Sequence, residues 1–172
     1  MAARVMVMAG GTGGHVFPAL AVADELRARG CDVAWLGTPN SFEARVVPQY
    51  GFPVYWIDAY RLRGQGVLGL ALAPPRLARA ALQAWGVIRR LRPQVVLGMG
   101  GFVTAPGGLV ARLTGRPLVI HEQNAIPGMT NQWLARIASR VLEAFPGSFA
   151  AARGATSTGN PVRRDIAALP PP

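Results

Sequence analysis

Lysine is absent from this chain of 172 residues, whose 18 basic residues are all arginines. P-loop nucleotidases require a Gly-Lys-Ser/Thr motif and Schiff-base enzymes require a lysine amine, so both classes are excluded. Acidic residues are also few, because Asp and Glu together number 8 and no Asp-x-Asp motif occurs. No His, Cys, Asp and Glu residues have the spacing of a metal-binding cluster. We therefore predict that the chain binds no metal ion and uses no cofactor.

Cysteine is nearly absent as well, since Cys31 stands alone and cannot form an internal disulfide. We interpret it as a small buried hydrophobic residue rather than a nucleophile. The N-terminal segment reaches Gly10 before it could form the apolar core of a signal peptide, which favours the cytoplasm. The apolar run at residues 67–75 is much shorter than the roughly twenty residues that cross a bilayer. We expect at most a shallow insertion into a membrane interface there.

The formal net charge of +10 predicts anionic partners. Nucleic acid, anionic lipid and phosphorylated substrates all satisfy this charge, which does not select among them. The chain contains no recognisable nucleic-acid-binding motif and no series of aromatic residues that would stack bases. Nucleic acid is therefore the least favoured of the three.

Short apolar segments alternate with helical stretches, as in a parallel sheet wound with helices. With 51% hydrophobic residues the chain can bury one full core, and we predict one α/β domain, a Rossmann-like parallel sheet with helices on both faces. Pro18 is expected in the first turn of the first helix. The predicted strands are residues 4–8, 32–36, 95–98, 117–121 and 141–144, and the predicted helices are residues 17–29, 75–92, 106–113 and 130–139.

Two of the apolar strands lead into glycine-rich turns. The first turn is Gly10-Gly11-Thr12-Gly13-Gly14-His15, and the second is Gly98-Met99-Gly100-Gly101. Glycines let the backbone approach a ligand closely, and the helix that follows directs its free N–H groups and positive dipole end toward the turn. The carboxyl ends of parallel strands meet at one edge of the sheet, where we also expect His121-Glu122-Gln123-Asn124. The pattern favours a phosphate or diphosphate site, with turns that serve only the fold as the alternative.

The first turn departs from a dinucleotide-binding fingerprint at two points. Val16 stands where the G-x-G-x-x-G motif has its third glycine. The strand at residues 32–36 leads into Gly37-Thr38, without the acidic residue that would bind a cofactor ribose. A nicotinamide-dependent enzyme is therefore disfavoured.

An ordered set of motifs extends over essentially the whole chain. It comprises the two glycine-rich turns, Pro106-Gly107-Gly108-Leu109, His121-Glu122-Gln123-Asn124, Thr130-Asn131 and Gly159-Asn160-Pro161-Val162-Arg163. In this order the motifs resemble the GT-B glycosyltransferases that add N-acetylglucosamine to the lipid-linked precursor of bacterial peptidoglycan. The resemblance implies that residues 1–164 form an N-terminal, acceptor-binding, Rossmann-like domain. Residues 165–172 would then begin the linker to a C-terminal donor domain outside this sequence.

The resemblance also implies a reaction and a location. N-acetylglucosamine would pass with inversion from UDP-N-acetylglucosamine to the 4-hydroxyl of N-acetylmuramic acid in the undecaprenyl-pyrophosphoryl-pentapeptide acceptor. The protein would be peripheral, at the cytoplasmic face of the inner membrane. We expect the chain alone to be folded but inactive, because most donor contacts would belong to the other domain. A membrane-docking or acceptor-binding module without catalysis is the alternative.

Two residues are candidates for the base that deprotonates the attacking hydroxyl. His15 is the first, because imidazole titrates near neutral pH and the helix dipole favours its neutral form. A histidine that hydrogen-bonds the turn or contacts a donor phosphate is an equally weighted alternative. Glu122 is the second, since it matches a polar cleft position of the family. Its alternative role is to cap nearby groups or to pair with an arginine. Helix N-termini and arginine would stabilise the charge of the leaving diphosphate.

Binding residues follow from the same resemblance. The second turn is the better candidate for the acceptor diphosphate, because the first would hold the donor. Phe102 stands where many relatives carry tyrosine, so no hydroxyl contact is expected at that position. The implied donor-binding residues are Thr12, Gly13, Gly14, Asn124 and Arg163, and the implied acceptor-binding residues are Gly100, Gly101 and Asn131.

The predicted helix 75–92 has two distinct faces. We assign one to the core and predict that the other contacts anionic headgroups, because its apolar side chains lie beside arginines. Ordinary packing against a neighbouring element or another domain is the alternative. The core face comprises Leu77, Ala80, Ala84, Ile88 and Leu91, and the membrane face comprises Leu82, Trp85 and Arg89 with Ala78 and Arg92. Arg61, Arg63, Arg76 and Arg79 are near this face in the sequence.

Overall fold

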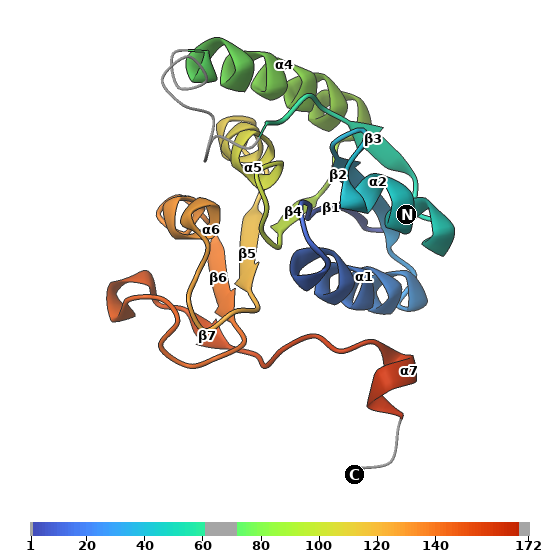
Figure 1. Cartoon of the computed structure of the whole chain (residues 1–172), viewed down its shortest axis with the longest axis vertical. Helices are drawn as coiled ribbons and strands as arrows, with labels where there is room; N and C mark the ends of the chain where they lie inside the picture. Colours follow the sequence, from blue (N-terminus) through green and yellow to red (C-terminus); the bar gives the residue numbers. More distant parts are fainter. Residues whose placement is uncertain (1, 61–71, 169–172) are drawn as a thin grey trace.

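Figure 1 shows the computed structural model, which describes residues 2–60 and 72–168. Seven parallel strands form one sheet in the order β3-β2-β1-β4-β5-β6-β7. The chain builds the sheet outward in one direction from β1 and then in the other direction from β4, so the order reverses between these two strands. The strands are β1 (Arg4–Met8), β2 (Asp32–Gly37), β3 (Val54–Trp56), β4 (Val95–Gly98), β5 (Leu118–Glu122), β6 (Arg140–Glu143) and β7 (Thr156–Ser157).

Helices cover both faces of the sheet, with α1 on one side and α4, α5 and α6 on the other (Figure 1). The predicted fold class is therefore confirmed. The α-helices are α1 (Gly13–Ala28), α2 (Phe42–Val46), α4 (Ala73–Leu91), α5 (Thr104–Leu113), α6 (Met129–Leu134) and α7 (Arg164–Ala167), and the short 3-10 helices are η1 (Val47–Tyr50) and η2 (Ala151–Arg153).

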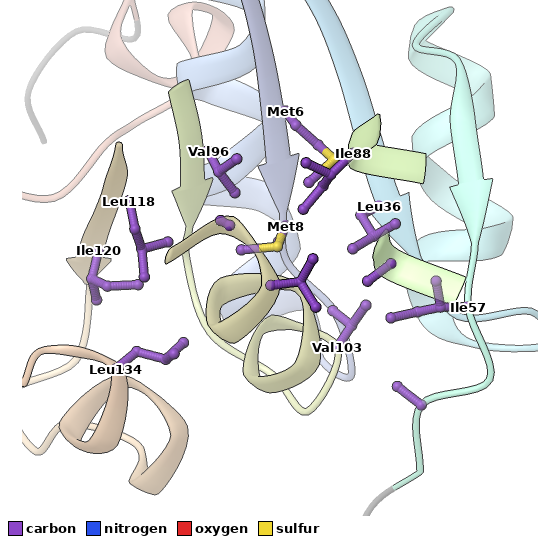
Figure 2. Close-up of a cluster of buried hydrophobic side chains, with 14 of the residues drawn as sticks. Met6, Met8, Leu36, Ile57, Ile88, Val96, Val103, Leu118, Ile120 and Leu134 are labelled. Atoms are coloured by element: carbon purple, nitrogen blue, oxygen red, sulfur yellow. The ribbon is translucent and has the colours of Figure 1, made fainter. Parts of the chain in front are cut away.

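Strand β1 contributes to the core on both faces because successive side chains of a strand point in opposite directions. Val5 and Val7 belong to the cluster that includes the buried residues of α1. Met6 and Met8 belong to the cluster under α4 and α5, where Met8 lies near Val103 and Leu36 (Figure 2). A central strand that is buried on both faces holds its carboxyl end firmly, and the first glycine-rich turn starts there.

All five predicted strands are present, with boundaries that agree to within one residue. Strands β3 and β7 escaped prediction because they contain three and two residues and join the sheet at its edges. Segments this short carry too little alternation to be distinguished from loops.

Helix boundaries needed more correction. Helix α1 begins at Gly13 rather than at residue 17, because the carbonyl of Thr12 accepts the backbone N–H groups of His15 and Val16. Pro18 therefore lies inside the helix and not in its first turn. Helix α6 ends at Leu134, five residues before the predicted end.

One residue of the predicted core face of α4 was wrongly assigned. Ala80, Ala84, Ile88 and Leu91 are buried, but Leu77 is 42% exposed. The helical period places Leu77 on the same face, yet no described element covers it at that end of the helix. Core membership depends on a covering neighbour, which helical spacing alone does not reveal.

Candidate functional site

The two glycine-rich turns lie side by side at the carboxyl edge of the sheet, because β1 and β4 are neighbours there. The backbone N–H of Gly10 donates to the carbonyl oxygen of Gly100 over 3.2 Å. Gly101 has a φ of 89°, and a Cβ added to it would lie 2.2 Å from the carbonyl oxygen of Gly10. The turns therefore contact each other backbone to backbone, which leaves no room for a side chain between them.

An open pocket of about 290 Å³ lies where the turns meet, and we call it the turn pocket. It occupies the place where the strand order reverses, which is the usual ligand position in open α/β sheets. A third segment, just before and within the start of α6, completes its wall. The lining residues are Gly10, Gly11, Thr12, His15, Gly100, Gly101, Phe102, Gly128, Met129, Thr130 and Asn131.

The start of α1 offers free hydrogen-bond donors beside this pocket. Within the described part of the chain, the backbone N–H groups of Gly13 and Gly14 donate to no acceptor. These groups lie in the first turn of a sixteen-residue helix, whose dipole adds positive potential at the same end. The arrangement suits an anionic oxygen such as that of a phosphate.

Glu43 lies beneath the first turn and is completely buried. Its carboxylate accepts the backbone N–H of Gly11 over 3.0 Å and that of Thr38 over 3.2 Å. The N–H of Gly11 is thus already occupied, so a ligand at this turn would find its donors further along, at the start of α1. Nothing in the sequence indicated this role, because Glu43 is distant from the turn in sequence and belongs to a five-residue helix.

Replacing Glu43 by glutamine is expected to lower the free energy of unfolding by about 1–3 kcal/mol. A glutamine amide has one acceptor oxygen, so its NH₂ group would face one of the two backbone donors. Urea denaturation of both proteins measures the difference. The matched control is Glu25→Gln, since this exposed carboxylate pairs with Arg29 over 2.7 Å and such surface pairs contribute about 0–1 kcal/mol. Equal losses in the two variants would mean that the hydrogen bonds of Glu43 with Gly11 and Thr38 do not stabilise the fold more than a surface ion pair does.

Glu122 is also completely buried, at the end of β5. Its carboxylate accepts four hydrogen bonds. Asn124 supplies two of them, from its backbone N over 3.0 Å and its Nδ2 over 2.8 Å. The backbone N of Gly128 and the Nδ2 of Asn131 supply the others, each over 3.0 Å. Glu122 therefore holds the 124–131 segment in place, and Asn131 connects this carboxylate to the turn pocket.

His15 is half-buried in the wall of the turn pocket. Burial lowers the pKa of its imidazole below the ordinary value of 6.5, although the charge of Glu122 and the carbonyl group of Met99 act in the opposite direction. The ring is therefore neutral near pH 7. Its Nδ1 lies 2.7 Å from the Nε2 of Gln123, a buried residue directly after β5. Gln123 belongs to the motif His121-Glu122-Gln123-Asn124, but the sequence assigned no function to this residue of the motif.

The structure brings together five of the predicted site residues, since Thr12, His15, Gly100, Gly101 and Asn131 all line the turn pocket. Asn124 is exposed, and its side chain donates to Glu122.

Arg163 lies outside the lining of the turn pocket. Its guanidinium is 5.3 Å from the centre of the Phe17 ring and donates to the hydroxyl of Tyr50 over 3.0 Å. The Phe17 ring is itself next to Gly13, so Arg163 borders the start of α1 through this aromatic side chain.

All five residues named for the predicted membrane face of α4 are solvent-exposed. Leu82 is 74% exposed, Trp85 is 42% exposed, and Arg89 is exposed beside them. Of the arginines grouped with this face, Arg79 pairs with Asp58 over 2.9 Å. Arg61, Arg63 and residues 67–71 of the apolar run lie outside the described residues, as do residues 169–172 of the predicted linker.

No group of three or more His, Cys, Asp or Glu side chains within residues 2–60 and 72–168 could hold a metal ion. None of the described helices combines the length and apolarity that a membrane span requires.

A parallel sheet with two glycine-rich turns at its switch point defines a Rossmann-like α/β domain of the type found in GT-B glycosyltransferases. Residues 5–143 match the glycosyltransferase family 28 N-terminal domain, and the chain belongs to this family.

Several relatives carry one name, UDP-N-acetylglucosamine--N-acetylmuramyl-(pentapeptide) pyrophosphoryl-undecaprenol N-acetylglucosamine transferase. That of Methylococcus capsulatus is 59% identical over 166 residues, covering 96% of this chain and 47% of the relative. That of Aeromonas hydrophila is 54% identical over 172 residues, covering 100% of this chain and 48% of the relative. The chain thus spans about half the length of the curated relatives it matches.

Solved structures agree with this assignment. The crystal structure of Acinetobacter baumannii MurG superposes with a TM-score of 0.81 at 47% identity, covering 92% of this chain and 46% of that chain. The Streptomyces glycosyltransferase SsfS6 superposes with a TM-score of 0.64 at 19% identity, which supports the fold alone.

Proposed function

We propose that this chain is the N-terminal, acceptor-binding half of a transferase that moves N-acetylglucosamine from UDP-N-acetylglucosamine to the 4-hydroxyl of N-acetylmuramic acid in the lipid-linked peptidoglycan precursor, with inversion. The observation that carries the proposal is the turn pocket, in which two glycine-rich turns and His15 meet at the switch point of the sheet. The shared name of the relatives supplies the substrates. Residues 1–164 form the acceptor domain in this proposal, and residues 165–172 begin the linker to the donor domain.

The chemistry needs three contributions. The attacking hydroxyl must lose its proton, the departing UDP needs its charge stabilised, and both substrates must be aligned. We assign charge stabilisation to the free N–H groups of Gly13 and Gly14, with Thr12, Asn124 and Arg163 as further donor contacts. Gly100, Gly101 and Asn131 are the residues that we propose for the acceptor.

Of the two residues predicted as the base, His15 fits a direct catalytic role better than Glu122. The carboxylate of Glu122 is buried and receives four hydrogen bonds, at least one of which a substrate hydroxyl would have to displace. His15 lines the turn pocket and is neutral near pH 7. We therefore propose that His15 contacts the reacting atoms and that Glu122 positions the segment carrying Asn124 and Asn131.

The experiment that tests this function measures transfer of labelled N-acetylglucosamine to a lipid-linked acceptor. The chain is assayed alone and together with a separately produced C-terminal half of a family member. Transfer in the mixture and none by the chain alone is the expected result. If both proteins are folded and the mixture transfers no sugar, while a covalently joined two-domain protein is also inactive, the transferase proposal is wrong. The chain would then be a membrane-docking or acceptor-binding module without catalysis.

We also propose that the chain is peripheral at the cytoplasmic face of the inner membrane, where α4 contacts anionic headgroups. The support is the exposure of Leu82 and Trp85 beside Arg89, since apolar side chains enter the interface while arginines attract anionic lipid. We propose this contact with headgroups for α4 alone among the described helices.

Charge reversal by Arg89→Glu is expected to weaken binding to anionic liposomes at low salt, measured by sedimentation, by about thirtyfold. Two unit charges change, and each basic residue near such a surface contributes about 1 kcal/mol. Arg29→Glu is the matched control, because Arg29 is exposed directly after α1, and α1 and α4 cover opposite faces of the sheet (Figure 1). Equal losses in both variants would indicate net charge rather than a docking face.

A further inference from the structure

Gln123 is a buried side chain that connects two strand ends and the start of α1. Its amide Nε2 lies 2.6 Å from the carbonyl oxygen of Met99, directly after β4, and 2.7 Å from the Nδ1 of His15. Its Oε1 lies 3.4 Å from the Nδ1 of His121. One amide group therefore contacts both of the histidines in the chain.

The orientation of this amide follows from its neighbour. A backbone carbonyl oxygen only accepts hydrogen bonds, so the nitrogen of the Gln123 amide has to face Met99. The opposite orientation would place two acceptor oxygens 2.6 Å apart, and it would also turn the NH₂ group toward His121. The short contact with Met99 thus decides which atom of the amide is nitrogen.

The amide nitrogen has two hydrogens, and both have a partner. One points to the carbonyl of Met99, and the other points to the Nδ1 of His15. A neutral imidazole that accepts at Nδ1 carries its single hydrogen on Nε2. Nε2 of His15 makes no hydrogen bond with any described residue, so this N–H remains for a ligand.

We propose that Gln123 is a positioning residue that fixes the tautomer of His15, so that His15 enters the turn pocket as a hydrogen-bond donor through Nε2. The inference rests on the proposed function for its consequence, since a donor at this place contacts a substrate oxygen. Of the roles that the sequence left open for His15, contact with a donor phosphate oxygen is then the one it performs. Proton removal through Nε2 is not, so the proton of the attacking hydroxyl passes to solvent in the open turn pocket rather than to His15. A donor fixed before the substrate arrives requires no reorganisation during the reaction.

The hydrogen bonds around His15 could also be arranged in a second way, with the imidazole in the other tautomer. The carbonyl of Met99 is also close enough to accept a hydrogen bond from the imidazole of His15. If His15 rather than Gln123 occupied that carbonyl, Nδ1 would carry the hydrogen and Nε2 would have a free lone pair. His15 would then be equipped to act as a base, and Gln123 would have no role in setting it.

Nitrogen-15 NMR of the chain with labelled histidine distinguishes the two arrangements at about pH 7.5, where imidazole is neutral. The chain has 2 histidines, so the spectrum contains two ring patterns, and a His121→Asn variant identifies which one belongs to His15. We expect the Nε2–H form of His15 to exceed the Nδ1–H form by at least about fivefold, the ratio that one net hydrogen bond supports. A predominant Nδ1–H form in the unaltered chain would overturn the proposal.

Gln123→Glu supplies the second arm, because a carboxylate presents only acceptors to His15. The Nδ1–H form, or a doubly protonated ring, is then expected to predominate. Gln49→Glu is the control, since the side chain of this exposed glutamine donates to the carbonyl of Arg45 and should leave the His15 pattern unchanged. Unchanged Nε2–H in a folded Gln123→Glu variant would also overturn the proposal.

If Gln123→Glu does not fold, Gln123→Ala takes its place. The freed carbonyl of Met99 should then draw the hydrogen of His15 to Nδ1, and an unaltered His15 pattern would count against the proposal. The NMR measurement requires no turnover. The proposed tautomer can therefore be wrong while the transferase assay succeeds, and it can be right while the transferase assay fails.

Discussion

His15→Ala is expected to reduce transfer of N-acetylglucosamine by about a hundredfold or more in the complete two-domain enzyme. The imidazole lines the turn pocket between the free N–H groups of α1 and the second glycine-rich turn. Its loss removes a preorganised polar group from the place where charge changes during the reaction. Steady-state transfer rates at saturating donor and acceptor measure the effect on kcat.

Arg29→Ala is the control for this variant, because Arg29 follows directly after α1 and its exposed side chain pairs with Glu25 of that helix. It should retain full activity, which separates the loss of the imidazole from a general disturbance of α1. A thermal unfolding curve of His15→Ala verifies that the variant is folded. An unchanged rate in a folded variant would remove His15 from the catalytic machinery.

Gly101→Ala is expected to lower the free energy of unfolding by about 3 kcal/mol or more. The left-handed φ of 89° costs a non-glycine residue about 1–2 kcal/mol. The new Cβ would also lie 2.2 Å from the carbonyl oxygen of Gly10, and forced overpacking costs about 1–3 kcal/mol. Neither turn can move away easily, because the N–H of Gly10 is bonded to the carbonyl of Gly100. Chemical denaturation of the chain measures the loss.

Gly115→Ala is the matched control for the glycine variant. Gly115 also has a left-handed φ, of 70°, but a Cβ added to it would have no neighbouring atom within 4 Å. This variant should therefore show only the conformational cost, about 1–2 kcal/mol. Equal losses in the two variants would mean that the close contact between the turns does not constrain them.

The predicted strands and the α/β class followed from local pattern, because a strand buried on both faces is a continuous apolar run and its end is marked by glycine or a polar motif. The glycine-rich turns were recognisable for the same reason. The start of α1 was not, since Gly13 and Gly14 have low helix propensity and the carbonyl of Thr12 overrides it by accepting two backbone N–H groups.

Glu43 and Gln123 were the functional neighbours that the sequence did not indicate. Each contacts residues that are distant in sequence. The carboxylate of Glu43 accepts from Gly11, and the amide of Gln123 contacts Met99 and His15. A lone glutamate or glutamine in a sequence has no feature that reveals such a partner. The exposure of Leu77 was not predicted for a related reason, because it depends on which element covers that part of α4.

The sequence by itself determined the α/β class, the order of the five longer strands and the helices between them, the family, the presence of two glycine-rich turns and the residue types available for chemistry. These properties reside in neighbouring residues, whose spacing and conformational preferences are local. Only the tertiary structure decided that the two turns touch, that Glu122 is occupied by four donors and that Gln123 faces His15. Those facts depend on the strand order that places β1 beside β4 and β4 beside β5, and on the directional hydrogen bonds that form once the strand ends have been brought together.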